Sequence, residues 1–197
     1  MLMNKTVIGS IAAMLVLGVG VVFAARGALS SGPADQAAGQ PTVSTAAPED
    51  ERASASVTGR PDCLSGTVAG VDLPCLGGEA TGPAADEGIT IVNVWAWWCE
   101  PCRTEMPHLM EVAAAHPEWK IVGVHADTNA GNGAAFLEDI GAEMPSFQDS
   151  DNKFAGALGL PGVIPITVVL KDGEVQGRII KAMTSAEEIE TSIEEYL

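Results

Sequence analysis

Short apolar, β-branched runs occur twice in the middle of the chain, over residues 89–95 and 120–126. Continuous apolar runs of this length are typical of strands that are buried on both faces of a sheet. Residues 102–115 and 133–140 have helical composition, and Gly141 suits the end of the second helix. The pattern therefore predicts the order strand, helix, strand, helix from residue 89 to residue 140.

The C-terminal part of the chain contains a predicted hairpin and a last helix. Residues 167–170 and 174–180 are apolar runs on either side of Asp172-Gly173, a dipeptide that marks a tight turn between two strands. Thr184 and Glu187 have the spacing of a capping box, which predicts that the last helix begins at Thr184. The complete order, β-α-β-α-β-β-α, predicts an α/β domain with a central mixed sheet flanked by helices.

The first 26 residues differ from the rest of the chain. Residues 7–25 form an apolar run of 19 residues that is interrupted only by glycines and Ser10. As a helix this run would be about 28 Å long, close to the thickness of a bilayer core. We expect residues 1–26 to be a retained signal anchor, or alternatively a signal peptide cleaved after Ala24. In both cases the remaining chain is exported.

A linker and one domain follow. Residues 27–60 contain 23 Ala, Ser, Thr, Pro or Gly residues among 34. Few large apolar side chains remain, and their burial cannot offset the entropy lost when the chain is ordered. We expect this stretch to be a disordered linker. Residues 61–197 contain all four Cys and all four Trp residues, and we expect them to form the domain.

The overall charge excludes two classes of partner. With 10 Lys and Arg against 26 Asp and Glu, the chain has a formal net charge of −16. A protein that follows the phosphate backbone of a nucleic acid, or binds anionic lipid head groups through a basic patch, would need the opposite sign.

The candidate chemistry lies in Cys99-Glu100-Pro101-Cys102, between the first predicted strand and the first predicted helix. At a helix N-terminus, free N–H groups and the helix dipole favour the thiolate of Cys99, which is the form that attacks a disulfide. Cys102, one turn later, is placed to resolve the mixed disulfide. A zinc site would need a second close Cys or His pair, and a c-type haem site would need His where Arg103 stands. A purely structural disulfide remains the alternative.

The motif and its surroundings resemble a known family. Trp95-Ala96-Trp97-Trp98 before the motif, Arg103-Thr104-Glu105-Met106-Pro107 after it and Gly162-Val163-Ile164-Pro165 downstream are similar to thioredoxin-fold proteins, and specifically to exported thiol–disulfide oxidoreductases of the TlpA, ResA and DsbE type. The resemblance covers about residues 71–197. It implies a thioredoxin-like fold and disulfide exchange with protein substrates, without a cofactor or metal.

The same resemblance implies roles for further residues. Pro165 would be cis and face the active disulfide, leaving the backbone of Ile164 free to pair with an extended substrate segment. Independently of the resemblance, the position of Trp97 and Trp98 next to Cys99 predicts that they shield the cysteine pair and provide an apolar rim. Asn93 stands where thioredoxin has a buried Asp that moves a proton, so Glu105 is the expected substitute, with a pKa raised by partial burial. A surface position is the alternative for Glu105.

The remaining cysteines and the histidines lie outside the motif. Cys63 and Cys75 are expected to pair in an oxidising compartment as a structural disulfide, with a second redox-active pair as the alternative. None of His108, His116 and His125 has a partner at ligand spacing, and we expect all three at surface or edge positions.

We therefore predict an exported, membrane-tethered thiol–disulfide oxidoreductase whose electrons come from a membrane protein partner. The resemblance of Glu100-Pro101 and Glu105 to the reductive branch favours a reductant, as in cytochrome c maturation. Glu100 should also make the Cys99 thiolate less favourable by like charge, which makes the pair more reducing. The alternative is an exported oxidase in protein folding. A copper-binding module on the same fold is a further, less favoured alternative. Copper-delivering relatives separate their two Cys by three residues, whereas two residues separate Cys99 from Cys102.

Overall fold

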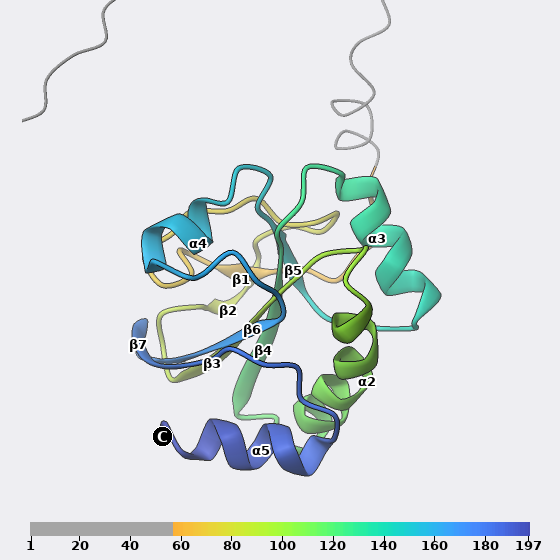
Figure 1. The fold of residues 1–197 in the computed structure, drawn as a ribbon. Coiled ribbons are helices and arrows are strands. Elements are labelled where there is room, and N and C mark those ends of the chain that lie inside the picture. Colours follow the sequence, from red (N-terminus) through yellow and green to blue (C-terminus); the bar gives the residue numbers. More distant parts are fainter. Residues whose placement is uncertain (1–56) are drawn as a thin grey trace, which may run out of the picture. The chain divides into compact units, whose positions relative to one another are not determined.

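The computed structural model describes residues 57–197. The predicted anchor and nearly all of the predicted linker lie outside the described residues. Within the described part, no helix is long and apolar enough to cross a membrane. The elements are β1 (Leu64–Ser65), β2 (Gly82–Ala84), β3 (Ile89–Trp95), α2 (Glu100–Ala115), β4 (Trp119–His125), α3 (Ala130–Asp139), β5 (Ser146–Gln148), α4 (Lys153–Leu158), β6 (Ile166–Lys171), β7 (Glu174–Ile179) and α5 (Ala186–Glu194) (Figure 1).

The main sheet has five strands in the order β5-β4-β3-β6-β7. Strands β3, β4 and β5 are parallel, whereas β6 is antiparallel to β3 and to β7. The predicted hairpin is present, and Asp172 and Gly173 at its tip have φ values of 52° and 80°. The predicted mixed sheet flanked by helices is confirmed. β1 and β2 form a separate two-stranded parallel sheet.

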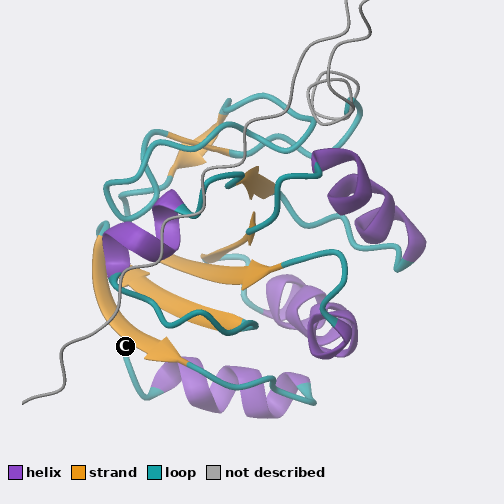
Figure 2. Ribbon diagram, turned by 45° about the horizontal axis from the view of Figure 1, so that its top comes forward, coloured by secondary structure: helices purple, strands orange, loops and turns teal. Residues whose placement is uncertain are grey.

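The alternation of side chains along the strands divides the core into two layers. Ile91 and Trp95 of β3 pack with α2, α3 and α5 on one face of the sheet. Val92 and Val94 point to the other face, where they pack with Phe154 of α4 and with the segment before β3. Figures 1 and 2 show α5 and α4 on opposite sides of the strands. Because both faces are covered, the central strands are continuous apolar runs, as the sequence indicates.

Side chains that cap the helices move their starting points away from the predicted ones. α2 begins at Glu100 because Cys99 caps it, and α3 begins at Ala130 because the Asn129 side chain accepts the N–H of Asn132 at 3.0 Å. The predicted capping box at Thr184 is wrong by one residue. The hydroxyl of Ser185 accepts the N–H of Glu188 at 3.2 Å, so Ser185 is the cap of α5.

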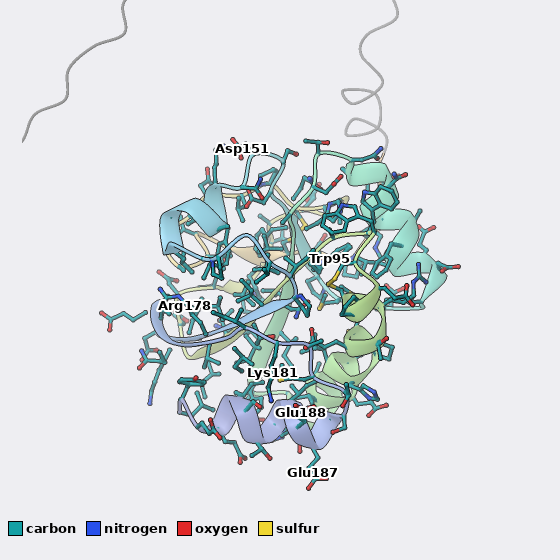
Figure 3. All side chains as sticks on the ribbon, in the orientation of Figure 1. Trp95, Asp151, Arg178, Lys181, Glu187 and Glu188 are labelled. Atoms are coloured by element: carbon teal, nitrogen blue, oxygen red, sulfur yellow. A yellow bond between two sulfur atoms is a disulfide. The ribbon has the colours of Figure 1, made fainter. Side chains whose placement is uncertain are left out.

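The carboxylate of Glu188 reaches back over the start of α5. It accepts the N–H of Thr184 at 2.9 Å and lies 2.7 Å from Lys181 Nζ; Figure 3 labels Lys181 and Glu188 at this helix. These bonds satisfy an N–H group just before the helix and fix the direction in which the chain enters it.

Two helical glycines form a matched pair for a stability test. A Cβ at Gly133 in α3 would lie 2.7 Å from Cε1 of the fully buried His125, whereas a Cβ at Gly156 in α4 would meet nothing within 4 Å. Since Ala favours a helix over Gly, we expect Gly156→Ala to raise the free energy of unfolding by about 0.5–1 kcal/mol. Gly133→Ala should lower it by about 1–3 kcal/mol through overpacking. Urea unfolding measures both, and equal stabilisation by the two changes would contradict the packing argument.

Candidate active site

The disulfide Cys99–Cys102 lies at the N-terminus of α2, just beyond the C-terminal end of β3. Its Cα atoms are 5.3 Å apart, which is within the usual range. Cys99 caps the helix, since its Sγ accepts the N–H of Cys102 at 3.2 Å. Cys99 is 4% exposed and Cys102 is 0% exposed. Cys99 is therefore the sulfur within reach of a partner, and Cys102 lies behind it.

The two residues between the cysteines suit the helix start. Pro101 occupies the first turn, where its missing N–H costs no helical hydrogen bond. Glu100 is exposed and is the acidic residue of that turn. In the reduced protein, the N–H groups of this turn would stabilise a thiolate on Cys99, and the carboxylate of Glu100 would oppose it.

An apolar groove of about 250 Å³ lies beside the motif. It includes Trp98 from the motif side and Ile164, which precedes the cis-Pro165, from the β6 side. Pro165 itself is buried. The lining residues are Val94, Trp98, Ala126, Asn152, Ala155, Leu160, Pro161, Gly162, Val163, Ile164 and Ile166. The only polar side-chain groups among these lining residues are the amide of Asn152 and the indole N–H of Trp98, which is bonded to Asp127. The groove therefore suits an apolar side chain of a bound segment.

Glu105 is fully buried, so the surface alternative is wrong. One carboxylate oxygen accepts the Asn93 amide at 2.9 Å, and the other accepts the backbone N–H of Met183 at 2.9 Å. Burial raises the pKa of Glu105, and repulsion from Glu188 adds to it, although both hydrogen bonds act to lower it. The predicted raised pKa is thus supported, one turn of α2 beyond Cys102.

Cys63 and Cys75 form the predicted disulfide, with Cα atoms 5.7 Å apart. Cys63 is fully buried, and Cys75 pairs with Phe147 of β5 through an isolated β-bridge. The disulfide therefore fastens the segment before the main sheet close to its β5 edge.

Removal of this second disulfide should destabilise the domain. The bond joins residues separated by 12 positions, and the chain-entropy treatment assigns a loop of that size about 2–3 kcal/mol. We expect a Cys63→Ser/Cys75→Ser variant to lose that much free energy of unfolding in urea while retaining disulfide exchange at Cys99. If exchange were abolished in a variant that remains folded, the second pair would belong to the electron path.

The prediction for His125 is wrong. Its side chain is fully buried at the end of β4, which lies between β3 and β5, and its ring centroid is 4.6 Å from that of Trp95. Trp95 lies in the interior near the start of α2 (Figure 3). His125 Nδ1 is 2.8 Å from Oε1 of Gln148, and burial lowers the pKa of His125. A neutral ring is easier to bury than an imidazolium, so the core accepts it.

Asp127 is a site residue that the sequence analysis missed. It follows β4, and its carboxylate accepts the indole N–H groups of Trp97 at 3.1 Å and Trp98 at 2.9 Å. Since β3 and β4 are parallel, the loops that follow them meet at the same edge of the sheet. That placement is the signal that could have indicated Asp127.

Within residues 57–197, no group of three His, Cys, Asp or Glu residues is arranged to hold a metal ion.

Comparison with known sequences places this site in a family. Residues 71–178 match the AhpC/TSA family. The chain is 38% identical over 90 residues to a Paracoccus denitrificans DsbE homolog, a thiol:disulfide interchange protein, covering 41% of this chain and 48% of the relative. It is 32% identical over 133 residues to the thiol:disulfide interchange protein HelX of Rhodobacter capsulatus, covering 63% of this chain and 74% of HelX. The match to the thiol-disulfide oxidoreductase ResA of Bacillus anthracis, 31% over 99 residues, covers 47% and 55%. The chain thus spans about half the length of two of these three relatives and 74% of HelX.

Solved structures agree in fold. A secreted Mycobacterium tuberculosis disulfide oxidoreductase homologous to E. coli DsbE superposes with a TM-score of 0.52 at 21% identity, covering 61% of this chain and 90% of that one. A thioredoxin family thiol:disulfide interchange protein of Chlorobium tepidum gives 0.53 at 23% identity, covering 71% and 95%. At these identities the structures support the fold alone. The fold is that of thioredoxin-like proteins, and the family match over residues 71–178 shows that the chain belongs to the AhpC/TSA family.

Proposed function

We propose that the protein is a thiol–disulfide oxidoreductase that exchanges disulfides with protein substrates through Cys99 and Cys102. The observation that carries this proposal is the position of Cys99, at a helix N-terminus, beside an apolar groove and more exposed than its partner. The names of the relatives DsbE, HelX and ResA support the same activity.

The exchange proceeds in two steps that conserve electrons. The Cys99 thiolate attacks one sulfur of a substrate disulfide, which forms a mixed disulfide and expels the other substrate sulfur as a thiolate that takes up a proton. The Cys102 thiolate then attacks Cys99 Sγ, which forms the Cys99–Cys102 disulfide and releases the second substrate thiolate. Two electrons have then passed to the substrate, and a dithiol protein partner must return them for the next cycle.

Glu105 is the proposed proton carrier for the resolving step. Cys102 must lose its proton before it attacks, and it is fully buried, so water cannot reach it freely. A carboxyl group with a raised pKa, one turn away on the same helix, suits this task better than the amide of Asn93, which does not titrate.

The direction we propose is reduction of the substrate. Glu100 lies in the helix turn that would otherwise stabilise the Cys99 thiolate, and a less stabilised thiolate makes the disulfide harder to reduce. A membrane protein that delivers electrons from the cytoplasm would be the partner, and the reduced thiols of apocytochrome c are one candidate product. An exported, membrane-tethered location through residues 1–26 belongs to the same proposal.

The reduction potential of Cys99–Cys102 tests both activity and direction. Equilibration of the purified protein in glutathione or dithiothreitol buffers should give a two-electron transition at or below about −250 mV, near thioredoxin. A value near about −120 mV would instead assign the protein to disulfide formation. A Cys99→Ser/Cys102→Ser variant, which keeps Cys63–Cys75, should show no transition in that range. The absence of any transition in the wild-type protein would overturn the proposal.

A further inference from the structure

Trp97 and Trp98 are the central residues of a turn that leads into Cys99. The turn is closed by a hydrogen bond of 3.0 Å from the N–H of Cys99 to the carbonyl of Ala96. Both indole N–H groups point to one carboxylate, that of Asp127 in the loop after β4. Trp97 is 38% exposed and Trp98 is 57% exposed. The orientation of two exposed aromatic rings beside the reactive sulfur therefore depends on one acidic residue.

Asp127 is itself held firmly. Its carboxylate also accepts the backbone N–H of Asn129 at 2.8 Å. Its backbone carbonyl accepts the side-chain amide of the buried Gln148, whose oxygen lies 2.8 Å from Nδ1 of His125. Burial favours the neutral acid, but the bonds from Asn129 and the two indoles outweigh it and lower the pKa of Asp127. The lowered pKa favours the ionised carboxylate, which accepts one indole on each of its two oxygens.

The two indoles face different surroundings. Trp98 lines the apolar groove that also contains Ile164, whereas Trp97 borders a shallow depression with Phe136 and Arg103. The Arg103 guanidinium lies 4.7 Å from the centre of the Phe136 ring and 2.6 Å from Asp139, so this side is also fixed. An exposed indole whose rotamer is already fixed loses less entropy when a partner covers it.

We propose that Asp127 is a positioning residue that prepares Trp97 and Trp98 to receive the substrate segment next to its cysteine, and that this segment carries an apolar or aromatic side chain. The inference rests on the proposed function and deepens it by naming what the substrate must offer. Three hydrogen bonds, from the two indoles and from the N–H of Asn129, already engage the Asp127 carboxylate, so we assign it the positioning of the indoles and not the binding of substrate.

The test compares two disulfide substrates during turnover with dithiothreitol. One is a peptide with Val and Phe beside its cysteine, joined to glutathione, and the other is hydroxyethyl disulfide, which has no side chain for the groove. Asp127→Ala should raise KM for the peptide, so that kcat/KM for the peptide relative to the small disulfide falls about tenfold. Asp127→Asn keeps one acceptor oxygen, so its ratio of the two kcat/KM values should lie between those of wild type and Asp127→Ala. The near-ultraviolet circular dichroism of the tryptophans should change in the same order.

Two controls separate the positioning of the indoles by Asp127 from other effects of the substitution. Within residues 57–197, the exposed carboxylate of Asp151, labelled in Figure 3, pairs only with Lys153. Asp151→Ala removes that carboxylate and should leave the ratio at its wild-type value. In a Trp97→Phe/Trp98→Phe background, which keeps the rings but removes the N–H donors, Asp127→Ala should have no further effect on the ratio.

The outcomes are distinguishable. An unchanged ratio in Asp127→Ala, or an equal effect of that change with and without the two Phe substitutions, would overturn the role of Asp127 while leaving the exchange activity intact. If the wild-type protein reduced neither disulfide, the proposed function itself would be overturned, whatever the circular dichroism showed.

Discussion

A Cys102→Ser variant should hold its substrate on Cys99 as a stable mixed disulfide. The hydroxyl of serine cannot resolve the intermediate, so the cycle stops after the first step, and we expect steady-state turnover to fall by about a thousandfold or more. The covalent complex should be visible as an adduct on a non-reducing gel, and mass spectrometry of the proteolysed complex should place the bond on Cys99.

Cys99→Ser is the matched control, since it changes the other sulfur of the same pair by the same single atom. Cys99 is 4% exposed and caps α2, whereas Cys102 is 0% exposed. Cys99→Ser should therefore abolish turnover and form no adduct. An adduct on Cys102 in this variant would mean that the buried sulfur attacks first, and the order of steps proposed here would have to be reversed.

The strongest features of the fold were predictable because they depend on local pattern. β3 matches the predicted strand at residues 89–95, and β4 lies one residue earlier than predicted. Both are covered on two faces, so burial leaves a continuous apolar run in the sequence. The Asp172-Gly173 turn was predictable because its positive φ values favour glycine and aspartate.

The elements that sequence analysis missed are those whose signal is not local. β5 has three residues, Ser146–Gln148, and is a strand because β4 pairs with it. α4 has six residues and no cap from its own Asn152. Its first N–H groups are accepted instead by Asp149, at 2.8 Å from Lys153 and 3.0 Å from Phe154. A short helix whose first N–H groups bond to a buried carboxylate several residues upstream is too short to show a helical periodicity of apolar residues in the sequence.

The residues of the candidate site that lie in sequence motifs were predictable, whereas those that contact the site from a neighbouring strand were not. Cys99, Cys102, Glu105 and Pro165 are marked by their neighbours in sequence. Asp127 lies 29 positions from Trp98 and reaches it only because two parallel strands end together. His125 was misplaced for the same reason, since its burial depends on Gln148 and Trp95, which lie on neighbouring strands.

Replacement of Glu105 should change both the stability of the domain and its pH dependence. Glu105→Ala leaves the N–H of Met183 and the amide of Asn93 without their acceptor in the core, and we expect a loss of about 3–5 kcal/mol. Glu105→Gln keeps an acceptor for Met183. Among the residues that the structure describes, none bonds to Asn93 Oδ1, so rotation of that amide lets it accept the new amide N–H. We therefore expect Glu105→Gln to cost about 1 kcal/mol or less at neutral pH.

The pH dependence identifies the titrating group. Burial raises the pKa of Glu105 above its ordinary 4.5, so the folded protein holds this proton more tightly than the unfolded chain does. The contribution to stability is complete below the unfolded pKa and is lost as the pH rises through the folded one. Urea unfolding from about pH 5 to about pH 8 should therefore show the stability of wild type falling relative to Glu105→Gln. The comparison with Glu105→Gln cancels carboxylates with lowered pKa values, such as Asp127, whose contributions have the opposite sign. A difference that is constant or grows with pH would show that Glu105 stays ionised in the core, and it could then not carry the proton from Cys102.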